Sequence, residues 1–534
     1  MAYDSSQGTL FPLAEDKALS ARWTELEGKK SNLVNRSYDY AMWTLPYIFP
    51  RTEVKDTELQ GPLDSIGARA ANHLSNKLVM TLFQPSQPFF RLTVNDDVAE
   101  ELAIKAKQGD QNADDLITAL DKGLAKAEKS AMKELDYNHY RTEATTAAKN
   151  LIITGNALMY HPEGKNERTQ VYSVKDYCVV RDLSGNVIEF MTKETKALST
   201  FKQEVREVLE AANKDKYKGE KEVCIYTQVK LSEEDGKYHL TQYADDYKLA
   251  SHGTWPAEDL PWIVLTWNLV RGEDYGRGLV EDYAGAFHAL YVLAQAEVDV
   301  VAIAADIKFL VDPASTLDVE ELNKSASGTY HSGKEGDITA NQLNKAVDMQ
   351  MVEGMVQRLE QQIGAAFLLQ SAVTRDAERV TAEEVRANAN ELDIAHGGVY
   401  SRFAEEWQYR TAVLMLKRVK IDLGSNKTID PVIITGLDSL SRAGDLDNLR
   451  LLVSDLALLQ AVPDEIRAGI DPQKFIAYCG VRRGVEYDKF LKTPAQMQED
   501  EQKALAQQQE LEQAKAGTKF AGEAAKATLN QGEQ

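Results

Sequence analysis

Two long helical segments with a compact stretch between them constrain this chain more than any other feature of its sequence. A helix over 278–305 would contain about 28 residues and be ~42 Å long. Along 347–370, apolar residues recur on one helical face, at Val352, Val356, Leu359, Ile363 and Phe367. The intervening 306–346 has strand-like and turn-like pieces (IKFLVDP, GTYHSG, GDIT) and a short helix at 317–325. The pattern predicts two helical legs that carry a small α/β insert.

A charged stretch follows the second long helix directly. Residues 371–380 concentrate four charged side chains, Arg375, Asp376, Glu378 and Arg379. Thr381 then stands three residues before Glu384, which is the spacing of a capping box at a helix start. The stretch therefore predicts a loop with a defined end, followed by a helix to about residue 419 that bends at Gly397 and Gly398. By itself, an ordinary solvated surface turn explains these charges as well.

The rest of the chain predicts a mostly helical α+β protein. Period-two patterns predict an antiparallel sheet or small barrel at about 157–270, interrupted by a helix at 199–213. Further strands are expected at 88–94 and 431–436. Helices are expected at 8–48, 64–83, 97–135, 139–153, 440–460, 462–469 and 472–479. From residue 494 onward the chain is rich in Ala, Gln, Glu and Lys, which favours a helix but provides few apolar anchors.

Composition excludes several classes of protein. The 534 residues carry a net charge of −22, with 61 basic and 83 acidic side chains, whereas tight DNA binders usually have a basic excess. Cys178, Cys224 and Cys479 lie too far apart to predict a disulfide framework or a zinc site. No run of 18 apolar residues predicts a membrane span, and the first residues do not predict a secretory signal.

A search for catalytic motifs predicts no enzyme. The eight histidines form neither an H-x-H nor an H-E-x-x-H pair, and the chain has no phosphate-binding loop or G-x-S-x-G elbow. The glycines of GEDYGRG, at 272–278, predict a turn before a helix rather than a phosphate site. We therefore expect no catalytic residues, no cofactor and no metal.

Six stretches together resemble one known family. They are IGARAANHLSNKLVMTLF (66–83), DLSGNV (182–187), EDYGRGLVEDY (273–283), SAVTRDAERVTAEEVR (371–386), GGVYS (397–401) and TGLDSLSRAGDLDNL (435–449). In this order and spacing, the chain resembles the portal (head-to-tail connector) proteins of short-tailed double-stranded DNA bacteriophages. The resemblance extends over residues 8 to 480 and is weakest at 200–260 and in the tail.

The resemblance implies a portal fold that assembles as a ring, dodecameric in the virions of the family. Its parts would be a wing (1–277), a first stem helix (278–305), a clip (306–346), a second stem helix (347–370), a channel loop (371–380), a bent wing helix (381–430), a crown (431–490) and a C-terminal helical tail or barrel (491–534).

The same resemblance implies a structural protein at a capsid vertex, through which DNA is packaged and ejected. It would be a virion component assembled in the host cytoplasm, with no role in a membrane. The implied partners are the terminase large subunit, tail adaptor, tail tube and nozzle proteins, major capsid and scaffolding proteins, internal core proteins, and double-stranded DNA in weak non-specific contact.

The resemblance also suggests roles for particular residues. The channel loop would act as a valve, through Arg375 and Arg379 with Asp376 and Glu378, although Arg379 could instead form an ion pair with an adjacent subunit. Lys308 and Arg358 are candidates for contact with DNA phosphates. Lys324, His331 and Lys334 are candidates for a docking surface on the clip. Two other functions stay open: a non-portal adaptor or scaffolding component, and a metal-dependent nucleic-acid-processing enzyme.

Overall fold

The computed structural model divides the chain into two compact units. Unit 1 comprises Met1–Phe89 and Ser130–Ile421, and unit 2 comprises Phe90–Lys129 and Asp422–Gln534. The residues that the structure describes are 10–11, 19–51, 61–85, 88–94, 111–164, 167–201, 203–212, 222–245, 247–249, 253–305, 308–315, 317–334, 336–341, 346–369, 382–419, 431–434, 452–455, 457 and 472–483. Both units mix helices with antiparallel strands, so the expected mostly helical α+β class is confirmed.

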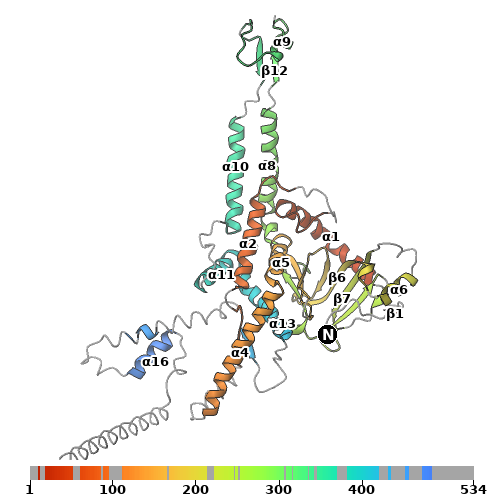
Figure 1. Ribbon diagram of the computed structural model, residues 1–534, viewed down its shortest axis with the longest axis vertical. Helices are drawn as coiled ribbons and strands as arrows, with labels where there is room; N and C mark the ends of the chain where they lie inside the picture. The colour runs from red at the N-terminus through yellow and green to blue at the C-terminus, as the bar shows by residue number, and fades with distance from the viewer. Residues whose placement is uncertain are drawn as a thin grey trace, which may run out of the picture. The chain divides into compact units, whose positions relative to one another are not determined.

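A seven-stranded antiparallel sheet forms one side of unit 1 (Figure 1). Its strand order is β1-β9-β8-β7-β6-β5, and β10 also pairs with β8. The bounds are β1 (Leu10–Phe11), β5 (Tyr177–Arg181), β6 (Val187–Ala197), β7 (Glu222–Leu231), β8 (Tyr238–Ala244), β9 (Tyr247–Leu249) and β10 (Thr254–Trp255). The prediction of a helix from residue 8 is wrong at its start, because Leu10 and Phe11 pair with Leu249 and Lys248 as a strand.

Helix α1 (Leu19–Trp43) packs against this sheet. Arg22 on α1 forms a 2.7 Å ion pair with Glu189 on β6, whose carboxylate is almost buried. The next residue, Trp23, is buried beside Met191 and Tyr243 of the sheet. The ammonium of the buried Lys30 donates to the carbonyls of Val174 (2.8 Å), Lys175 (3.0 Å) and Tyr177 (2.7 Å). These three bonds compensate for the loss of water around the charge.

A second, three-stranded sheet has the order β11-β3-β4, with bounds β11 (Trp262–Thr266), β3 (Asn156–Tyr160) and β4 (Gln170–Tyr172). It lies against α5 (Tyr140–Thr154), and α5 packs in turn on α2 (Ile66–Leu82).

The core of unit 1 centres on Phe83, Tyr140 and Trp407. The ring of Phe83 meets the rings of Tyr140 and Trp407 edge-on, with centroids 5.1 and 5.3 Å apart. Trp407 Nε1 donates to the Tyr140 hydroxyl at 2.7 Å, so the polar atoms of this core are paired.

Two long helices leave this body side by side, α8 (Ala284–Ala305) and α10 (Ala346–Ala366) (Figure 1). The expected helix over 278–305 is divided, because the short α7 (Leu279–Asp282) ends at Tyr283 before α8 begins. Between them, β12 (Lys308–Val311) pairs with β13 (Ile338–Asn341), and α9 (Val319–Lys324) lies in the connection. The GTYHSG stretch forms turns and irregular structure rather than a strand.

After the charged stretch, the chain forms the bent helix that the two glycines predict. Helix α11 (Ala382–His396) ends at Gly397 and Gly398, whose φ angles are +65° and +80°. The chain continues through α12 (Val399–Phe403), one π-helical turn (Ala404–Tyr409) and α13 (Arg410–Arg418).

Unit 2 contains a two-stranded antiparallel sheet of β2 (Arg91–Val94) and β14 (Pro431–Ile434), which confirms both expected strands. Helix α4 (Gln111–Tyr137) begins in unit 2, and α16 (Pro472–Arg483) matches the expected helix at 472–479. The expected helix at 462–469 and the tail from 491 lie outside the described residues. Of the expected helix at 440–460, only 452–455 and 457 are described, and these are helical.

Within the described residues, Ala284–Ile303 of α8 is long and apolar enough, by length and composition, to cross a membrane, with a mean hydropathy of 1.4. Only 17% of this window is buried, so most of an apolar helix faces away from its own chain. Glu297 and Asp299 interrupt the window, and charged side chains at that depth are costly in a bilayer.

Candidate functional site

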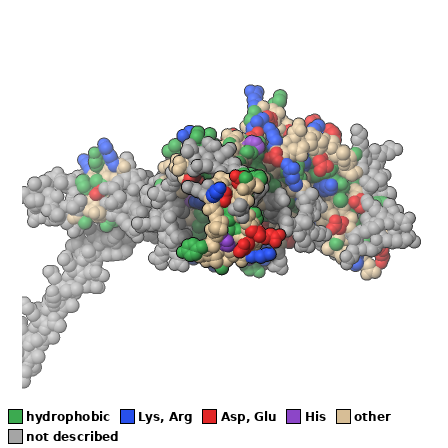
Figure 2. Space-filling view, turned by 90° about the horizontal axis from the view of Figure 1, so that it is seen from above, with side chains coloured by type: hydrophobic (Ala, Val, Ile, Leu, Met, Phe, Trp, Pro, Cys, Tyr) green, Lys and Arg blue, Asp and Glu red, His purple; other side chains and the backbone are tan. Residues whose placement is uncertain are grey.

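The proposed docking residues all lie in the small insert between α8 and α10. Lys324 ends α9, with its ammonium 3.7 Å from the Glu320 carboxylate, and both side chains are exposed. His331 Nε2 lies 3.2 Å from Thr329 Oγ1. The backbone N–H of Lys334 donates to Asp337 Oδ2 at 2.7 Å. The structure therefore brings the three residues into one module, and all three are exposed. Figure 2 shows acidic and basic side chains intermixed on the face seen from this end.

The insert also exposes apolar side chains that the sequence reasoning missed. Phe309 and Leu310 on β12 are 66% and 57% exposed, and Tyr330 is fully exposed. Adjacent residues on a strand point to opposite faces, so a two-stranded sheet with no cover exposes both. The sequence does contain a signal for this surface, because Phe309 and Leu310 are neighbouring apolar residues in a very short module.

The buried apolar residues of α8 and α10 lie at the ends of these helices that join the body. Phe287, Leu290 and Ala294 of α8 are buried there, and the rings of Phe287 and Phe367 meet edge-on at 5.7 Å. Further along, Val292 and Ile303 of α8 are 50% and 58% exposed. At 100° per residue these two lie on the side of α8 opposite the buried set.

Helix α10 has its own exposed apolar surface. Met351 and Met355, four residues apart on one face, are 71% and 48% exposed. They lie about 120° around the helix from the buried Ile363 and Phe367, taking 100° per residue. The helix pair therefore carries two separate apolar surfaces, one on each helix.

The two candidate DNA-contacting residues lie on different elements. Arg358 is exposed on α10. The backbone of Lys308 begins β12, paired with Asn341, and its side chain lies outside what the structure describes. The structure does not bring these two residues together.

The candidate valve residues, Arg375, Asp376, Glu378 and Arg379, lie outside the described residues, as does Thr381. The described chain stops at Leu369, after Leu368 with a left-handed φ of +57°, and resumes at Ala382. Helix α11 begins at Ala382, immediately after Thr381, which is where the capping-box spacing predicts a helix start. Glu384 lies in its first turn, and its side chain is not described.

Contacts on α2 and α12 fix the position of α11. Lys77 of α2 is almost buried and forms an ion pair with Glu391 of α11. At the glycine bend, Asp393 accepts from the N–H groups of Tyr400 (2.7 Å) and Ser401 (3.1 Å) and from the Ser401 hydroxyl (2.6 Å). Asp393 thereby caps α12 across the bend. The sequence reasoning missed these residues, because their partners are distant in the sequence or lie across a break.

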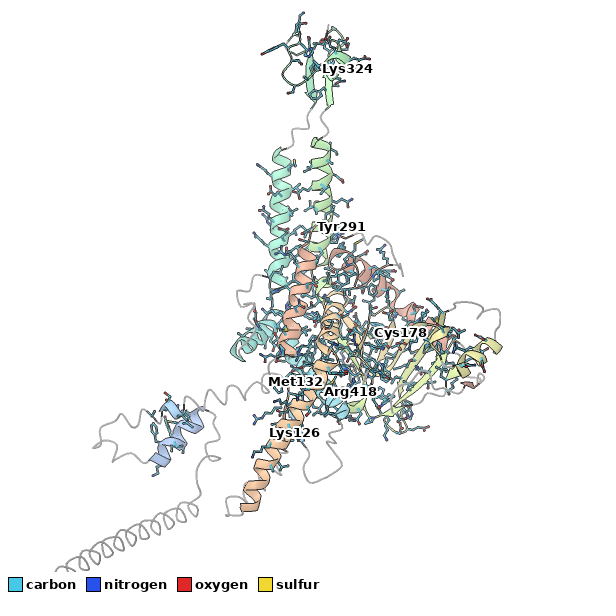
Figure 3. All side chains as sticks on the ribbon, in the orientation of Figure 1. Lys126, Met132, Cys178, Tyr291, Lys324 and Arg418 are labelled. Carbon is cyan, nitrogen blue, oxygen red and sulfur yellow. The ribbon has the colours of Figure 1, made fainter. Side chains whose placement is uncertain are left out.

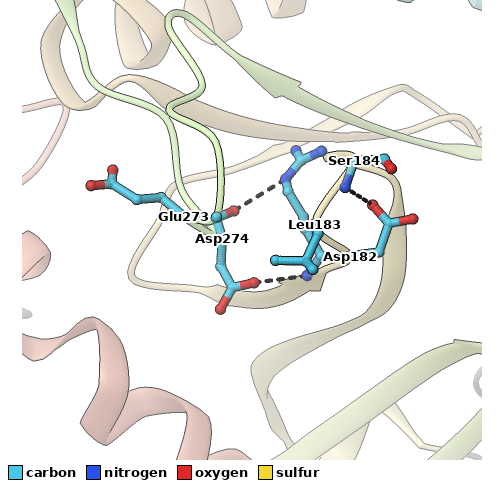
Figure 4. Close-up of a pocket in the computed structure, with 7 residues that line it drawn as sticks. Asp182, Leu183, Ser184, Glu273 and Asp274 are labelled. Atoms are coloured by element: carbon cyan, nitrogen blue, oxygen red, sulfur yellow. Dashed lines mark hydrogen bonds between the residues drawn. The ribbon is translucent and has the colours of Figure 1, made fainter.

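Two of the stretches that carry the family resemblance meet in unit 1 (Figure 4). The N–H of Arg181, just before the Asp182 turn, donates to Asp274 Oδ1 at 2.8 Å. Arg181 Nε donates to the Asp274 carbonyl at 3.1 Å, and Nη1 to the Gly185 carbonyl at 2.7 Å. Asp182 Oδ1 in turn accepts from the N–H groups of Ser184 and Asn186. The acidic residues here order two loops around one arginine.

Gly276 and Gly278 of the GEDYGRG turn serve close backbone packing. Gly155, which ends α5 with a φ of +80°, would place a Cβ only 2.4 Å from the Gly278 nitrogen. Asn156 clamps the same turn, since its Oδ1 accepts from the Gly276 N–H and its Nδ2 donates to the Gly276 carbonyl, both at 2.7 Å. These contacts explain the glycines without a phosphate ligand.

Among the described residues, no group of three or more His, Cys, Asp or Glu side chains is placed to hold a metal ion. In Figure 4, the carboxylates of Asp182 and Asp274 accept hydrogen bonds from the loop backbone N–H groups of Ser184 and Arg181.

Comparison with protein families identifies the family of this chain. A family model described as "Bacteriophage head to tail connecting protein" matches residues 16–488. The chain belongs to this family. Head-to-tail connecting proteins form the portal at a capsid vertex, so the chain is a structural virion component at the head–tail junction, where DNA passes, and not an enzyme.

Curated portal proteins of other phages are similar in sequence to most of this chain. The portal protein of Escherichia phage T7 is 32% identical over 462 residues, covering 85% of this chain and 84% of that protein. The portal protein of Enterobacteria phage T3 is 33% identical over 463 residues, with the same coverage. That of Pseudomonas phage phiKMV is 30% identical over 521 residues, covering 96% of each chain. A solved structure titled as the neck of an empty GTA particle computed with C6 symmetry has a TM-score of 0.38 at 10% identity, covering 79% of this chain and 90% of that one.

Proposed function

We propose that this head-to-tail connecting protein works as a ring of identical subunits, with a helical stem around a DNA channel. In this ring α8 and α10 form the stem, and the insert between them is the clip. The body up to residue 277 is the wing, residues 371–380 are the channel loop, and 431–490 belong to the crown.

The observation that carries this proposal is the pair of uncovered apolar surfaces on the two long helices. Val292 and Ile303 face one way on α8, while Met351 and Met355 lie on α10. A contact between the α8 surface of one copy and the α10 surface of the next is head-to-tail, and repeated contacts of this kind close into a ring. Such a ring would cover apolar area that a lone subunit exposes to water.

Ring symmetry gives the charged loop a function in the channel. One arginine in each copy becomes a collar of arginines around the channel, so Arg375 and Arg379 could contact the phosphates of passing DNA. Asp376 and Glu378 would limit the strength of that contact. The net charge of −22 for each subunit also favours weak contact with DNA. A protein that makes few phosphate contacts releases few counterions and therefore binds DNA weakly.

The clip provides the docking surface in this proposal. Lys324, His331 and Lys334 would meet acidic groups of the terminase large subunit during packaging, and tail adaptor, tail tube or nozzle proteins afterwards. The exposed Phe309 and Tyr330 would supply the apolar centre that a stable interface needs. The wing and crown would face the major capsid, scaffolding and internal core proteins.

Electron microscopy of the purified full-length protein tests the ring directly. We expect radially symmetric particles with a central hole. Discrete monomers at micromolar concentration would contradict the proposed ring.

The channel loop is tested in virions. We expect Arg379→Ala particles to retain less packaged DNA than wild type, with normal ring assembly. Arg51→Ala, at an exposed arginine on the body, is the matched control and should retain DNA normally. Wild-type DNA retention by Arg379→Ala would reject the valve role.

Terminase docking is tested by charge reversal on the clip. The double variant Lys324→Glu, Lys334→Glu should bind the terminase large subunit at least tenfold more weakly while still forming rings. Lys237→Glu, in the exposed β7–β8 turn, should bind as wild type. Equal binding by all three proteins would place the docking surface elsewhere.

A further inference from the structure

A small cavity lies in unit 1, lined by residues other than the proposed docking and DNA-contacting ones. Its volume is about 170 Å³, and it lies between the last turns of α13 and the chain segments around β10 and the end of β3. It is lined by His161, Glu163, Thr254, Trp255, Pro256, Asp259, Pro261, Leu414, Lys417 and Arg418. Thr254, Pro256 and Glu163 are exposed, so the cavity has an entrance from solvent. Figure 3 shows Arg418 in the body, well separated from Lys324 in the insert.

Arg418 brings a nearly buried positive charge to this cavity. Its side chain is 5% exposed, and its Nε lies 3.3 Å from Glu134 Oε1. Its Nη2 donates to the Gly164 carbonyl at 2.8 Å and lies 3.3 Å from Asn138 Oδ1 and from the Glu167 carbonyl. Nη1 is buried and has no hydrogen-bond partner among the described residues. A buried N–H group of a guanidinium without an acceptor is unfavourable, so this donor needs an acceptor atom from water or from a ligand.

His161 lines the same cavity and also has an unused polar atom. The residue is 2% exposed, and its ring stacks on Tyr140 with centroids 5.5 Å apart. Nδ1 lies 3.4 Å from Thr169 Oγ1, whereas Nε2 is buried without a hydrogen-bond partner among the described residues. Burial, together with the charges of Arg418 and Arg410, lowers the pKa of His161 to about 3. The ring is therefore neutral near pH 7 and can present Nε2–H when Nδ1 accepts from Thr169.

The other charged groups around the cavity already have partners. Lys417 forms an ion pair with Asp259, and Trp255 Nε1 lies 3.4 Å from Glu163 Oε1. Arg410, behind the cavity, donates to the carbonyls of Ala257 and Leu260. Among the described residues, the buried cavity donors that no carboxylate approaches are therefore Arg418 Nη1 and His161 Nε2, while Arg418 Nε, also without a hydrogen bond, faces Glu134 at 3.3 Å.

We propose that this cavity binds a single carboxylate group, which accepts hydrogen bonds from Arg418 Nη1 and His161 Nε2. Trp255, Pro261 and Leu414 provide an apolar wall for the carbon that bears the carboxylate. The nearby acidic groups Glu163 and Asp259 disfavour a dianion such as hydrogen phosphate, so the site selects a monoanion with an apolar part. The ligand is either a free small carboxylate or the side chain of an aspartate or glutamate in another protein.

Such a ligand would link elements that are distant in the sequence. It would hold the C-terminal turn of α13 to the chain after β3, and it would stabilise the folded state by mass action.

Direct titration of the full-length protein with [1-13C]acetate, followed by 13C NMR at pH 7 and constant ionic strength, tests the site. We expect saturable broadening of the acetate signal that excess formate reverses and equal chloride does not. N-acetyl-aspartate amide provides the second arm: tighter binding than acetate assigns the site to a protein side chain, and weaker binding assigns it to a free carboxylate. Broadening that does not saturate, or stronger competition by phosphate than by formate, would overturn the proposal.

Variants then assign the binding to this cavity. Arg418→Lys should weaken acetate binding at least tenfold. Leu414→Phe should also weaken acetate binding at least tenfold, because the larger ring fills the cavity while both donors stay in place. This second variant tests the site independently if Arg418→Lys does not fold. Lys237→Gln, in the exposed β7–β8 turn away from the cavity, is the control and should bind within twofold of wild type. Unchanged acetate binding in both Arg418→Lys and Leu414→Phe would show that the carboxylate binds elsewhere.

Discussion

Helices α5 and α8 of the same unit bury their apolar residues to very different degrees. In α5, Ala144, Leu151 and Ile152 are fully buried against α2 and the three-stranded sheet. In α8, which is more apolar, Val292, Val298, Val301 and Ile303 are each about half exposed or more. Hydrophobic content therefore does not say where the partner of a helix lies. For α5 the partner is within the chain, and for α8 it is, in our proposal, another copy.

The largest expected effect comes from changing the exposed side of α8. The double variant Val292→Asp, Ile303→Asp should abolish ring formation, because a neighbouring copy would then have to bury two unpaired carboxylates. The stability of the subunit itself should change by less than about 0.5 kcal/mol, as for other exposed positions. Analytical ultracentrifugation and urea denaturation measure the two quantities.

The control for this variant is Leu183→Asp, at an apolar residue in the β5–β6 turn that is 76% exposed. It should leave ring assembly intact. If the α8 variant forms rings normally, the exposed side of α8 does not contact a neighbouring copy. The proposed difference between α8 and α5 would then be wrong.

The next effect in size is expected in the core around α5. Phe83→Ala should lower the free energy of unfolding by about 3–5 kcal/mol, because the cavity left between Tyr140 and Trp407 cannot close completely. Met351→Ala on the exposed surface of α10 should cost the monomer less than about 0.5 kcal/mol. Urea denaturation followed by tryptophan fluorescence compares the two; equal costs would contradict our account of burial.

Glycine substitutions sharpen the comparison at the backbone. Gly155→Ala, at the end of α5, should destabilise by more than about 1 kcal/mol, since φ is positive and the new Cβ would meet Gly278. Gly285→Ala, in an open position of α8, should instead stabilise by about 0.5–1 kcal/mol through higher helix propensity. Thermal melting of both variants checks the opposite signs, and shifts of the same sign would count against this contrast.

The stability of the folded chain should also depend on pH. Because the pKa of His161 is lowered from its usual 6.5 to about 3, the unfolded state binds a proton across this interval and the folded state does not. Stability should therefore fall as the pH drops below 6.5, by up to about 1.4 kcal/mol for each pH unit. His161→Gln should reduce this slope between pH 6 and pH 4, whereas His331→Gln in the exposed insert should not. If His161→Gln leaves the slope of stability against pH unchanged, another group takes up the proton on unfolding.

The sequence alone determined much of the local architecture. Apolar periodicity located α2, α9, α10 and α16, and alternation located the β-rich region, because these patterns follow directly from helix and strand geometry. Gly397 and Gly398 marked the bend between α11 and α12, since both adopt positive φ. The six family-like stretches identified the family that the comparison confirmed.

Only the tertiary structure decided which residues meet across long distances in the chain. Leu10 and Phe11 become a strand because β9 offers them a pairing edge, which no local pattern encodes. Lys77 and Glu391, and Arg181 and Asp274, are paired by the fold and not by spacing. The exposure of Val292 and Ile303 likewise became visible only once the body of the subunit was seen to be complete without them. Periodicity reports that a helix has an apolar face, and the folded chain determines whether that face is already covered.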